Sequence, residues 1–166
     1  GIIQQALKDF AGVARRLDHH GKLSIDTHSV DLFDDYGHHP NEINAVFESL
    51  YSTYPDRRLV VIFQPHRYSR TRDLFDDFAR ALSGSGALIL LDIYPANEQP
   101  IAHINSSTLA DAIRQRSPLD PIVIKSTNEV LKVLPNVIQK NDVILTLGAG
   151  DIHTLVDLMT QEYANS

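Results

Sequence analysis

The sequence contains no cysteine and no long apolar run. Without cysteine the chain has no disulfide and no thiolate metal site, which fits a reducing cytoplasm. Without roughly 18 consecutive apolar residues, no membrane-spanning helix is expected. The first residues also lack the charged-then-apolar layout of a signal peptide. The chain begins with Gly1 rather than methionine, so we expect it to be cut from a longer protein.

Basic residues are also in short supply. Lys and Arg number 15 against 21 Asp and Glu, which gives a formal net charge of -6. Broad nucleic-acid binding would require a basic face, so no nucleic-acid partner is expected. The length of 166 residues and the hydrophobic share of 43% suit one domain with a sizeable core.

Several sequence motifs for phosphate or metal chemistry are missing. There is no G-x-x-x-x-G-K-[ST] phosphate loop and no H-E-x-x-H metal helix. The eight histidines show no zinc spacing. We interpret the pairs His19-His20 and His38-His39 as solvent, cap or ligand contacts. No metal site and no catalytic residue is assigned to this chain.

Short apolar runs alternate with helical periodicity along the chain. The runs predict five strands, at Val30–Asp35, Leu59–Phe63, Ala87–Ile93, Ile122–Ile124 and Val143–Leu147. Three of them are almost continuously apolar, as parallel strands covered on both faces are. The intervening helical patterns begin near residues 40, 74, 109, 126 and 152. This alternation predicts an α/β, Rossmann-like, mostly parallel sheet with helices on both faces.

Residues 1–28 have a different pattern and are interpreted as a hinge segment joined to a domain at 29–166. Arg15–Asp18 and Lys22–Asp26 could form two short strands around a turn at His20-Gly21. Such strands would make an antiparallel edge or a lead-in hairpin.

Polar segments follow the predicted strands. In doubly wound sheets, ligands bind at the carboxyl ends of the strands. The segment Asp34–Glu42 ends one strand and opens a helix, with Pro40 in the first turn and His39 or Asn41 as cap. Amides at that helix start favour an anion, and the carboxylates can accept ribose hydroxyls. An ordinary strand-turn-helix joint with polar caps explains the same residues equally well.

The segment Gln64–Arg72 carries three arginines and a histidine directly after a buried strand. Arg67 and Arg70 are spaced to lie on similar sides of a helix, and such a pair clamps a carboxylate or phosphate. A solvated basic loop is the less favoured explanation at this position. The segment Gly148–Asp151 is weak evidence for a phosphate turn, and a tight turn needing small residues is favoured.

Four segments taken together resemble the Mur ligase family, and within it the enzymes that join L-alanine to UDP-N-acetylmuramate. They match D-D-Y-G-H-H-P-x-E, F-Q-P-H-R-[YF]-[ST]-R-T, Y-P-A-x-E-x-P-I and G-A-G-[DN]-I in order and spacing, at residues 34–42, 63–71, 94–101 and 148–152. The stretch Ala6–Arg16 resembles the hinge that leads into the C-terminal domain of that family. The resemblance covers nearly the whole chain.

The resemblance implies a three-domain enzyme. The first domain would bind the UDP-sugar, and the central one would carry the phosphate loop, the Mg²⁺ ligands and a carbamylated lysine. The third, Rossmann-like domain would close over ATP and bring the amino acid. ATP would phosphorylate the muramoyl carboxylate, and the amine of L-alanine would attack the acyl phosphate. Since the phosphate loop is missing, we expect this chain to be the third domain only and inactive alone.

The family motifs imply roles for residues on the nucleotide side. Asp35 would hold the ATP ribose, and His38 would face the ATP phosphates. Arg16 occupies the hinge position near the nucleotide, although Arg15 could be the matching residue. Tyr36 would contribute to nucleotide or amino-acid contacts.

On the amino-acid side, the resemblance implies that Arg67 and Arg70 hold the L-alanine carboxylate, with His66 beside them. This agrees with the arginine clamp expected from the residues alone. Two other interpretations stay open. One is the related ligase that attaches a whole tripeptide to the same UDP-sugar during wall recycling. The other is a nucleotide- or anion-binding module without chemistry of its own.

Overall fold

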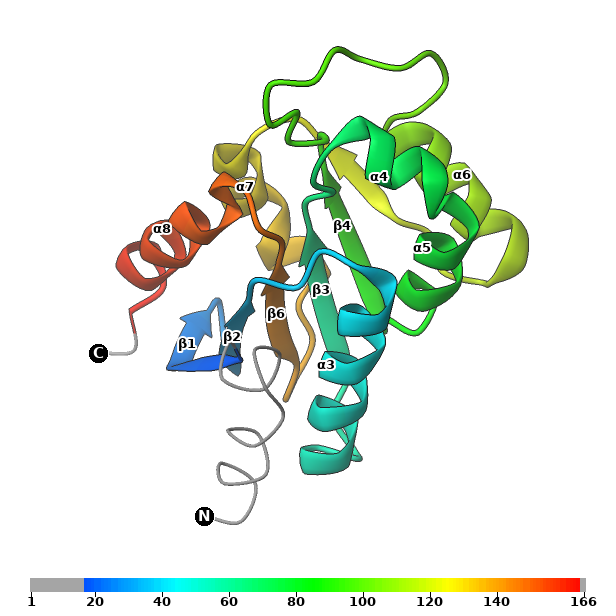
Figure 1. The fold of residues 1–166 in the computed structure, drawn as a ribbon. Coiled ribbons are helices and arrows are strands. Elements are labelled where there is room, and N and C mark those ends of the chain that lie inside the picture. The colour runs from blue at the N-terminus through cyan, green and yellow to red at the C-terminus, as the bar shows by residue number, and fades with distance from the viewer. Residues whose placement is uncertain (1–16, 165–166) are drawn as a thin grey trace.

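A computed structural model describes residues 17–164 and contains a six-stranded sheet with helices on both faces (Figure 1). The strand order is β1-β2-β6-β3-β4-β5. β1 pairs with β2 antiparallel, and all other neighbours are parallel. The predicted Rossmann-like class with one antiparallel edge is therefore confirmed. The strands are β1 (Asp18–Ile25), β2 (His28–Asp35), β3 (Leu59–Phe63), β4 (Ala87–Leu91), β5 (Ile122–Ile124) and β6 (Val143–Leu147).

The predicted turn at His20-Gly21 is wrong. β1 runs unbroken through these residues, and the hairpin turn lies at Asp26 and Thr27. The register of β1 on β2 shifts between His19 and Lys22, and Gly21 has a φ of 85°. The glycine therefore marks a β-bulge, where its tolerance of positive φ bends the strand without ending it. Arg15 and Arg16, the other part of that prediction, lie outside the described residues.

The helices follow the predicted pattern, with two local differences. The second predicted helix is α5, and a short further helix, α4, precedes it; β4 ends two residues earlier than expected. No helix between residues 17 and 164 has both the length and the apolar character needed to cross a bilayer. The helical elements are α3 (Pro40–Thr53), α4 (Tyr68–Asp73), α5 (Phe75–Leu82), α6 (Ser106–Arg116), α7 (Thr127–Val137), the 3₁₀ helix η1 (Asp151–His153) and α8 (Thr154–Glu162).

Local capping explains where the long helices begin. His39 caps α3 by accepting a hydrogen bond from the Asn41 amide. Ser126 is the N-cap of α7, close to the start that the helical pattern predicts, but its side chain makes no capping hydrogen bond. The capping box that the spacing of Ser126 and Glu129 would allow is therefore not formed. A capping box does form at the start of α6. The Asn105 side chain accepts from the Thr108 amide, and the Thr108 side chain accepts from the Asn105 amide.

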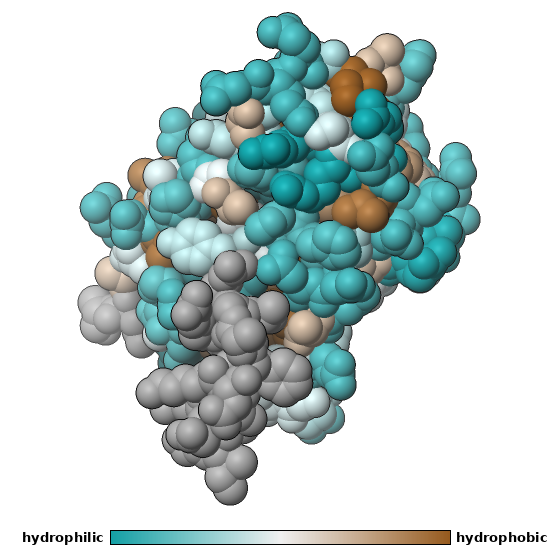
Figure 2. All heavy atoms as spheres, viewed as in Figure 1, coloured by the Kyte–Doolittle hydropathy of each residue, from teal (hydrophilic) through white to brown (hydrophobic). Residues whose placement is uncertain are grey.

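Alternate strand residues feed two hydrophobic layers. In β3, Val61 and Phe63 pack against α3, α5 and α6, whereas Val60 and Ile62 pack against α7 and α8. This alternation is the two-sided burial expected of parallel strands between helical layers. Among the described residues only Tyr36 and Ile122 are large exposed hydrophobics, and the face in Figure 2 is mainly hydrophilic.

Candidate functional site

The carboxyl ends of the central strands bring the predicted segments together. Asp35 and Phe63 both pair with Leu147 across the parallel ladders. The loops after β2, β3 and β6 therefore leave the sheet at one level. The loop after β4 joins them, because His66 and Tyr94 form an isolated parallel bridge.

The loop after β2 is a compact turn built on two carboxylates. Asp35 is 1% exposed, and its Oδ2 accepts a hydrogen bond from the Gly37 amide at 2.7 Å. Glu42 Oε1 accepts from the amides of His38 and His39, both at 3.1 Å. These bonds fix the backbone between β2 and α3, so the side chains that leave it have defined directions.

Two of those side chains point to different neighbours. The His38 ring lies 6.0 Å from the His66 ring, centroid to centroid, so it faces the arginine loop. The Tyr36 ring lies 6.0 Å from that of His153 in η1. Tyr36 is 41% exposed and is thus available to a ligand over the β2–β6 end of the sheet. The structure therefore brings His38, but not Tyr36, next to the predicted amino-acid residues.

His66 and Arg70 are in direct contact in the arginine loop. Arg70 Nη1 lies 3.1 Å from His66 Nδ1 and donates to the His66 carbonyl at 3.2 Å. The His66 ring also stacks on Tyr94, with centroids 5.4 Å apart. Burial, reinforced by the positive charge of Arg70, lowers the pKa of His66. A neutral His66 can accept from Arg70, so the guanidinium is held by a base without being neutralised.

Arg67 has an unusual backbone. Its φ of 75° and ψ of 139° lie in a region that non-glycine residues rarely adopt. Its amide donates to the Tyr94 carbonyl at 2.7 Å, and its carbonyl accepts from the Thr71 hydroxyl at 2.8 Å. Strained residues of this kind cluster at functional sites and persist where the surrounding structure holds them.

The two arginines are open to an anionic ligand. Among residues 17–164, neither Arg67 nor Arg70 takes part in an ion pair. Two guanidinium groups without a protein carboxylate can give a ligand carboxylate charge-assisted hydrogen bonds. Within the same described part, no three His, Asp or Glu side chains converge to hold a metal ion.

Two residues at this edge were not singled out from the sequence. Glu98 accepts hydrogen bonds from the Ser69 amide, at 3.0 Å, and from the Ser69 hydroxyl. Gln64 donates to Asp151 Oδ1 at 2.6 Å and accepts from the Ile152 amide. Both Gln64 and Glu98 belong to recognised motif segments, and that membership was the only available signal.

Asp34 faces away from Asp35, on the other side of β2. It is buried, and its Oδ1 accepts from the Thr146 hydroxyl at 2.5 Å. Burial raises the pKa of Asp34, although the Thr146 bond opposes that effect. Since its neighbours are β-sheet residues, Asp34 is placed to support the sheet, whereas Asp35 supports the loop.

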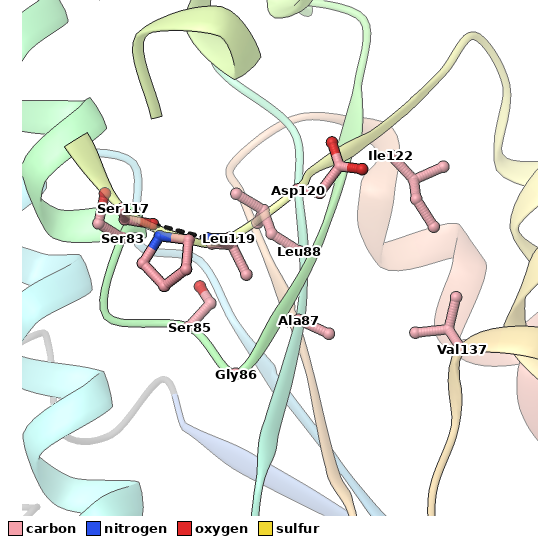
Figure 3. Close-up of a pocket in the computed structure, with 11 residues that line it drawn as sticks. Ser83, Ser85, Gly86, Ala87, Leu88, Ser117, Leu119, Asp120, Ile122 and Val137 are labelled. Carbon is pink, nitrogen blue, oxygen red and sulfur yellow. Dashed lines mark hydrogen bonds between the residues drawn. The ribbon is translucent and has the colours of Figure 1, made fainter. Parts of the chain in front are cut away.

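Two of the cavities lie at opposite ends of the strands. One, of about 350 Å³, adjoins the site and is lined by Gln64, Tyr94, Lys125 and Asp151 among others. The other, of about 340 Å³, lies at the amino ends of β4 and β5 (Figure 3). Its lining is mainly serine and aliphatic, and its one charged residue, Asp120, already pairs with Arg114. Of these two cavities, only the first brings charged and polar groups of the site together.

Comparison with known proteins shows which proteins have similar sequences and the same fold. Residues 15–150 match the family described as Mur ligase, glutamate ligase domain. The chain is 68% identical over 162 residues to the UDP-N-acetylmuramate–L-alanine ligases of Vesicomyosocius okutanii and of Ruthia magnifica. These alignments cover 98% of the chain and 34% of each relative, so the chain spans about a third of their length.

Solved structures give the same result for the fold. The UDP-N-acetylmuramate–alanine ligase of Thermotoga maritima matches with a TM-score of 0.63 and 25% identity, over 86% of this chain and 30% of that one. A murein peptide ligase of Psychrobacter arcticus matches with a TM-score of 0.73 and 18% identity, over 92% and 30%. Taken with the motifs at the sheet edge, these matches show that the chain belongs to the Mur ligase family and corresponds to its C-terminal, glutamate ligase domain.

Proposed function

We propose that this domain serves a cytoplasmic, ATP-dependent ligase that joins L-alanine to UDP-N-acetylmuramate in peptidoglycan precursor synthesis. Its own contribution is to contact the ATP ribose and the L-alanine carboxylate. The observation that carries the proposal is the pair of guanidinium groups of Arg67 and Arg70, which form no ion pair within residues 17–164 and lie beside His66 and His38 at the ligand edge of the sheet. Relatives at 68% identity carry the name of that ligase.

The nucleotide side of the proposal uses the loop after β2. Asp35 is fixed at a strand end, where a carboxylate can accept ribose hydroxyls. His38 points from the same turn toward the arginine loop and is assigned to the ATP phosphates. Tyr36 is exposed beside them and is assigned a contact with the nucleotide or the amino acid. Arg16, or Arg15, is assigned to the nucleotide from its place in the hinge motif.

The amino-acid side uses the arginine loop. Two guanidinium groups bind the L-alanine carboxylate, and the neutral His66 holds Arg70 in place. With the carboxylate anchored, the amine stays free and is presented to the acyl phosphate made on the UDP-sugar. The described residues do not fit Mg²⁺, so we assign that ion to the other domains and derive no step through it.

Charge-preserving variants in the complete ligase test this assignment. Arg67→Lys and Arg70→Lys keep the charge and lose the planar fork. We expect each to lower kcat/KM for L-alanine. The loss should correspond to roughly 1.5–3 kcal/mol of transition-state free energy, the range for hydrogen bonds to charged groups. The KM for ATP should change much less.

L-alaninamide, which lacks the carboxylate, is the matched control substrate. It should be a poor substrate for the wild-type enzyme and should lose little further activity in either variant, which makes the comparison a double-difference test. Equal losses with both substrates would show that the arginines do not hold the carboxylate. The tripeptide-recycling alternative has only fold-level support, from structures at 18% identity.

A further inference from the structure

We propose that Glu98 is a positioning residue for the amino-acid site, because its carboxylate fixes the first turn of α4 and with it the arginine pair. This inference rests on the proposed function and deepens it. Glu98 lies in the loop that follows β4, 29 residues beyond its partner Ser69. It would act through the backbone of α4 without touching the substrate.

The contact itself is specific to the start of α4. One carboxylate oxygen of Glu98 accepts from the Ser69 amide at 3.0 Å, and the other accepts from the Ser69 hydroxyl. These two hydrogen bonds are called the Glu98 clamp below. Ser69 lies between Arg67 and Arg70, so the clamp holds the segment that carries both guanidinium groups. Hydrogen bonds to an ionised acceptor are roughly twice as strong as neutral ones. The donors on Ser69 lower the pKa of Glu98, which keeps the carboxylate ionised at neutral pH.

Both segments that meet at this contact have strained backbones. On one side is Arg67, with a φ of 75°. On the other, Ala96 and Asn97 have φ values of 50° and 71°, and the Glu98 amide donates to the Pro95 carbonyl at 3.0 Å. Two consecutive positive φ values closed by such a bond form a type I′ turn, which alanine rarely enters. That turn aims the Glu98 side chain back at α4.

The strain indicates what Glu98 does. Strained conformations persist only where several contacts over-determine them. Arg67 is held by the bond from its amide to the Tyr94 carbonyl, and the Glu98 clamp holds the next turn of the chain. Without the clamp, Arg67 can relax toward an ordinary φ, which swings its side chain. A misplacement of about 1 Å at a substrate-positioning group can cost about 100-fold in rate.

Kinetics of the complete ligase give the first test. Glu98→Ala should raise the KM for L-alanine by about 10- to 100-fold, with little change in the KM for ATP or in kcat/KM for L-alaninamide. Glu98→Gln keeps one carbonyl acceptor and should fall between the wild type and Glu98→Ala. Asp73→Asn is the matched control, because Asp73 is an exposed carboxylate on the same short helix that contacts Arg72. It should behave as wild type.

A second readout does not depend on the substrate. In NMR spectra of the 166-residue chain, the chemical shift of the Ser69 amide should follow the ionisation of Glu98, with a pKa below the ordinary range of a glutamate. Glu98→Gln should abolish that pH dependence. Glu98→Ala should also shift the Arg67 amide. The positioning role is refuted by the following pair of results. The arginine variants lose activity with L-alanine and not with L-alaninamide, while Glu98→Ala has the same kinetic constants as Asp73→Asn. If the amides respond but the arginine variants fail that test, the amino-acid assignment falls and this inference with it.

Discussion

Replacing Gly150 by alanine puts a methyl group where the structure has no room for one. Gly150 is buried, with a φ of -89° and a ψ of -143°. The added Cβ would lie 2.5 Å from Gln64 Oε1, 2.7 Å from Tyr94 Cγ and 2.9 Å from Tyr94 Cδ2. All three distances are shorter than real Cβ contacts, so the substitution carries a steric cost.

The neighbours cannot both move freely. Gln64 Oε1 accepts from the Ile152 amide, and the Tyr94 ring stacks on His66. Forcing extra carbon into a packed site typically costs about 1–3 kcal/mol. We expect Gly150→Ala to lower the free energy of unfolding by that amount, or the Tm by about 2–4 °C per kcal/mol. Displacement of Tyr94 should also disturb His66 and, in the complete ligase proposed above, raise the KM for L-alanine.

Urea unfolding of the 166-residue chain measures the stability change. Gly84→Ala is the control, since its Cβ would meet no atom closer than 3.3 Å and the residue is exposed. An unfolding free energy for Gly150→Ala within about 0.5 kcal/mol of the wild type, the usual range of neutral surface substitutions, would refute the steric argument.

Three further predictions follow from the site and the sheet. The 166-residue chain alone should release no phosphate from ATP with UDP-N-acetylmuramate and L-alanine present, because it contains no phosphate loop; robust turnover would contradict this. In the complete ligase, Asp35→Ala should raise the KM for ATP more than that for L-alanine; a rise confined to L-alanine would count against the ribose assignment. Arg57→Ala should destabilise the fold by about 1.5–3 kcal/mol at neutral pH, because Arg57 donates to the buried Asp31 at 2.6 Å.

The last of these effects depends on pH with a defined sign. Burial alone would raise the pKa of Asp31, but hydrogen bonds from Arg57, His19 and Lys22 together lower it below its ordinary 3.8. A lowered carboxyl pKa stabilises the fold above the unfolded value, and that contribution is lost as the pH falls through the folded value. The difference between wild type and Arg57→Ala should therefore shrink below about pH 4, and unfolding curves at several pH values measure it.

Local sequence determined the strands and most helix starts. Three strands were predicted to the residue, at Leu59–Phe63, Ile122–Ile124 and Val143–Leu147. The first and last of these are covered on both faces, and such strands need continuous apolar residues. The sequence likewise marked the start of α3, with His39 or Asn41 as its cap, and the structure shows His39 in that position.

Long-range pairing decided what local sequence could not. His20-Gly21 resembles a turn, yet it became a bulge because β1 gains a full antiparallel ladder with β2 by continuing through it. Ser126 and Glu129 fit a capping box that the structure does not form. At His20-Gly21 the pairing with β2 outweighs a weak local turn preference, whereas nothing in the structure explains why the box at Ser126 is not formed.

The motifs alone named Asp35, His38, Arg67 and Arg70, but their mutual arrangement depends on the strand order. Placing β6 between β2 and β3 sets the loops side by side and lets the His38 ring face that of His66. The clamp of Glu98 on Ser69 joins segments 29 residues apart, which no periodicity encodes. Sequence patterns record which faces are buried, because burial repeats with each element. Which loops meet at the sheet edge is fixed only when the strands pair, because that depends on their order and level in the sheet.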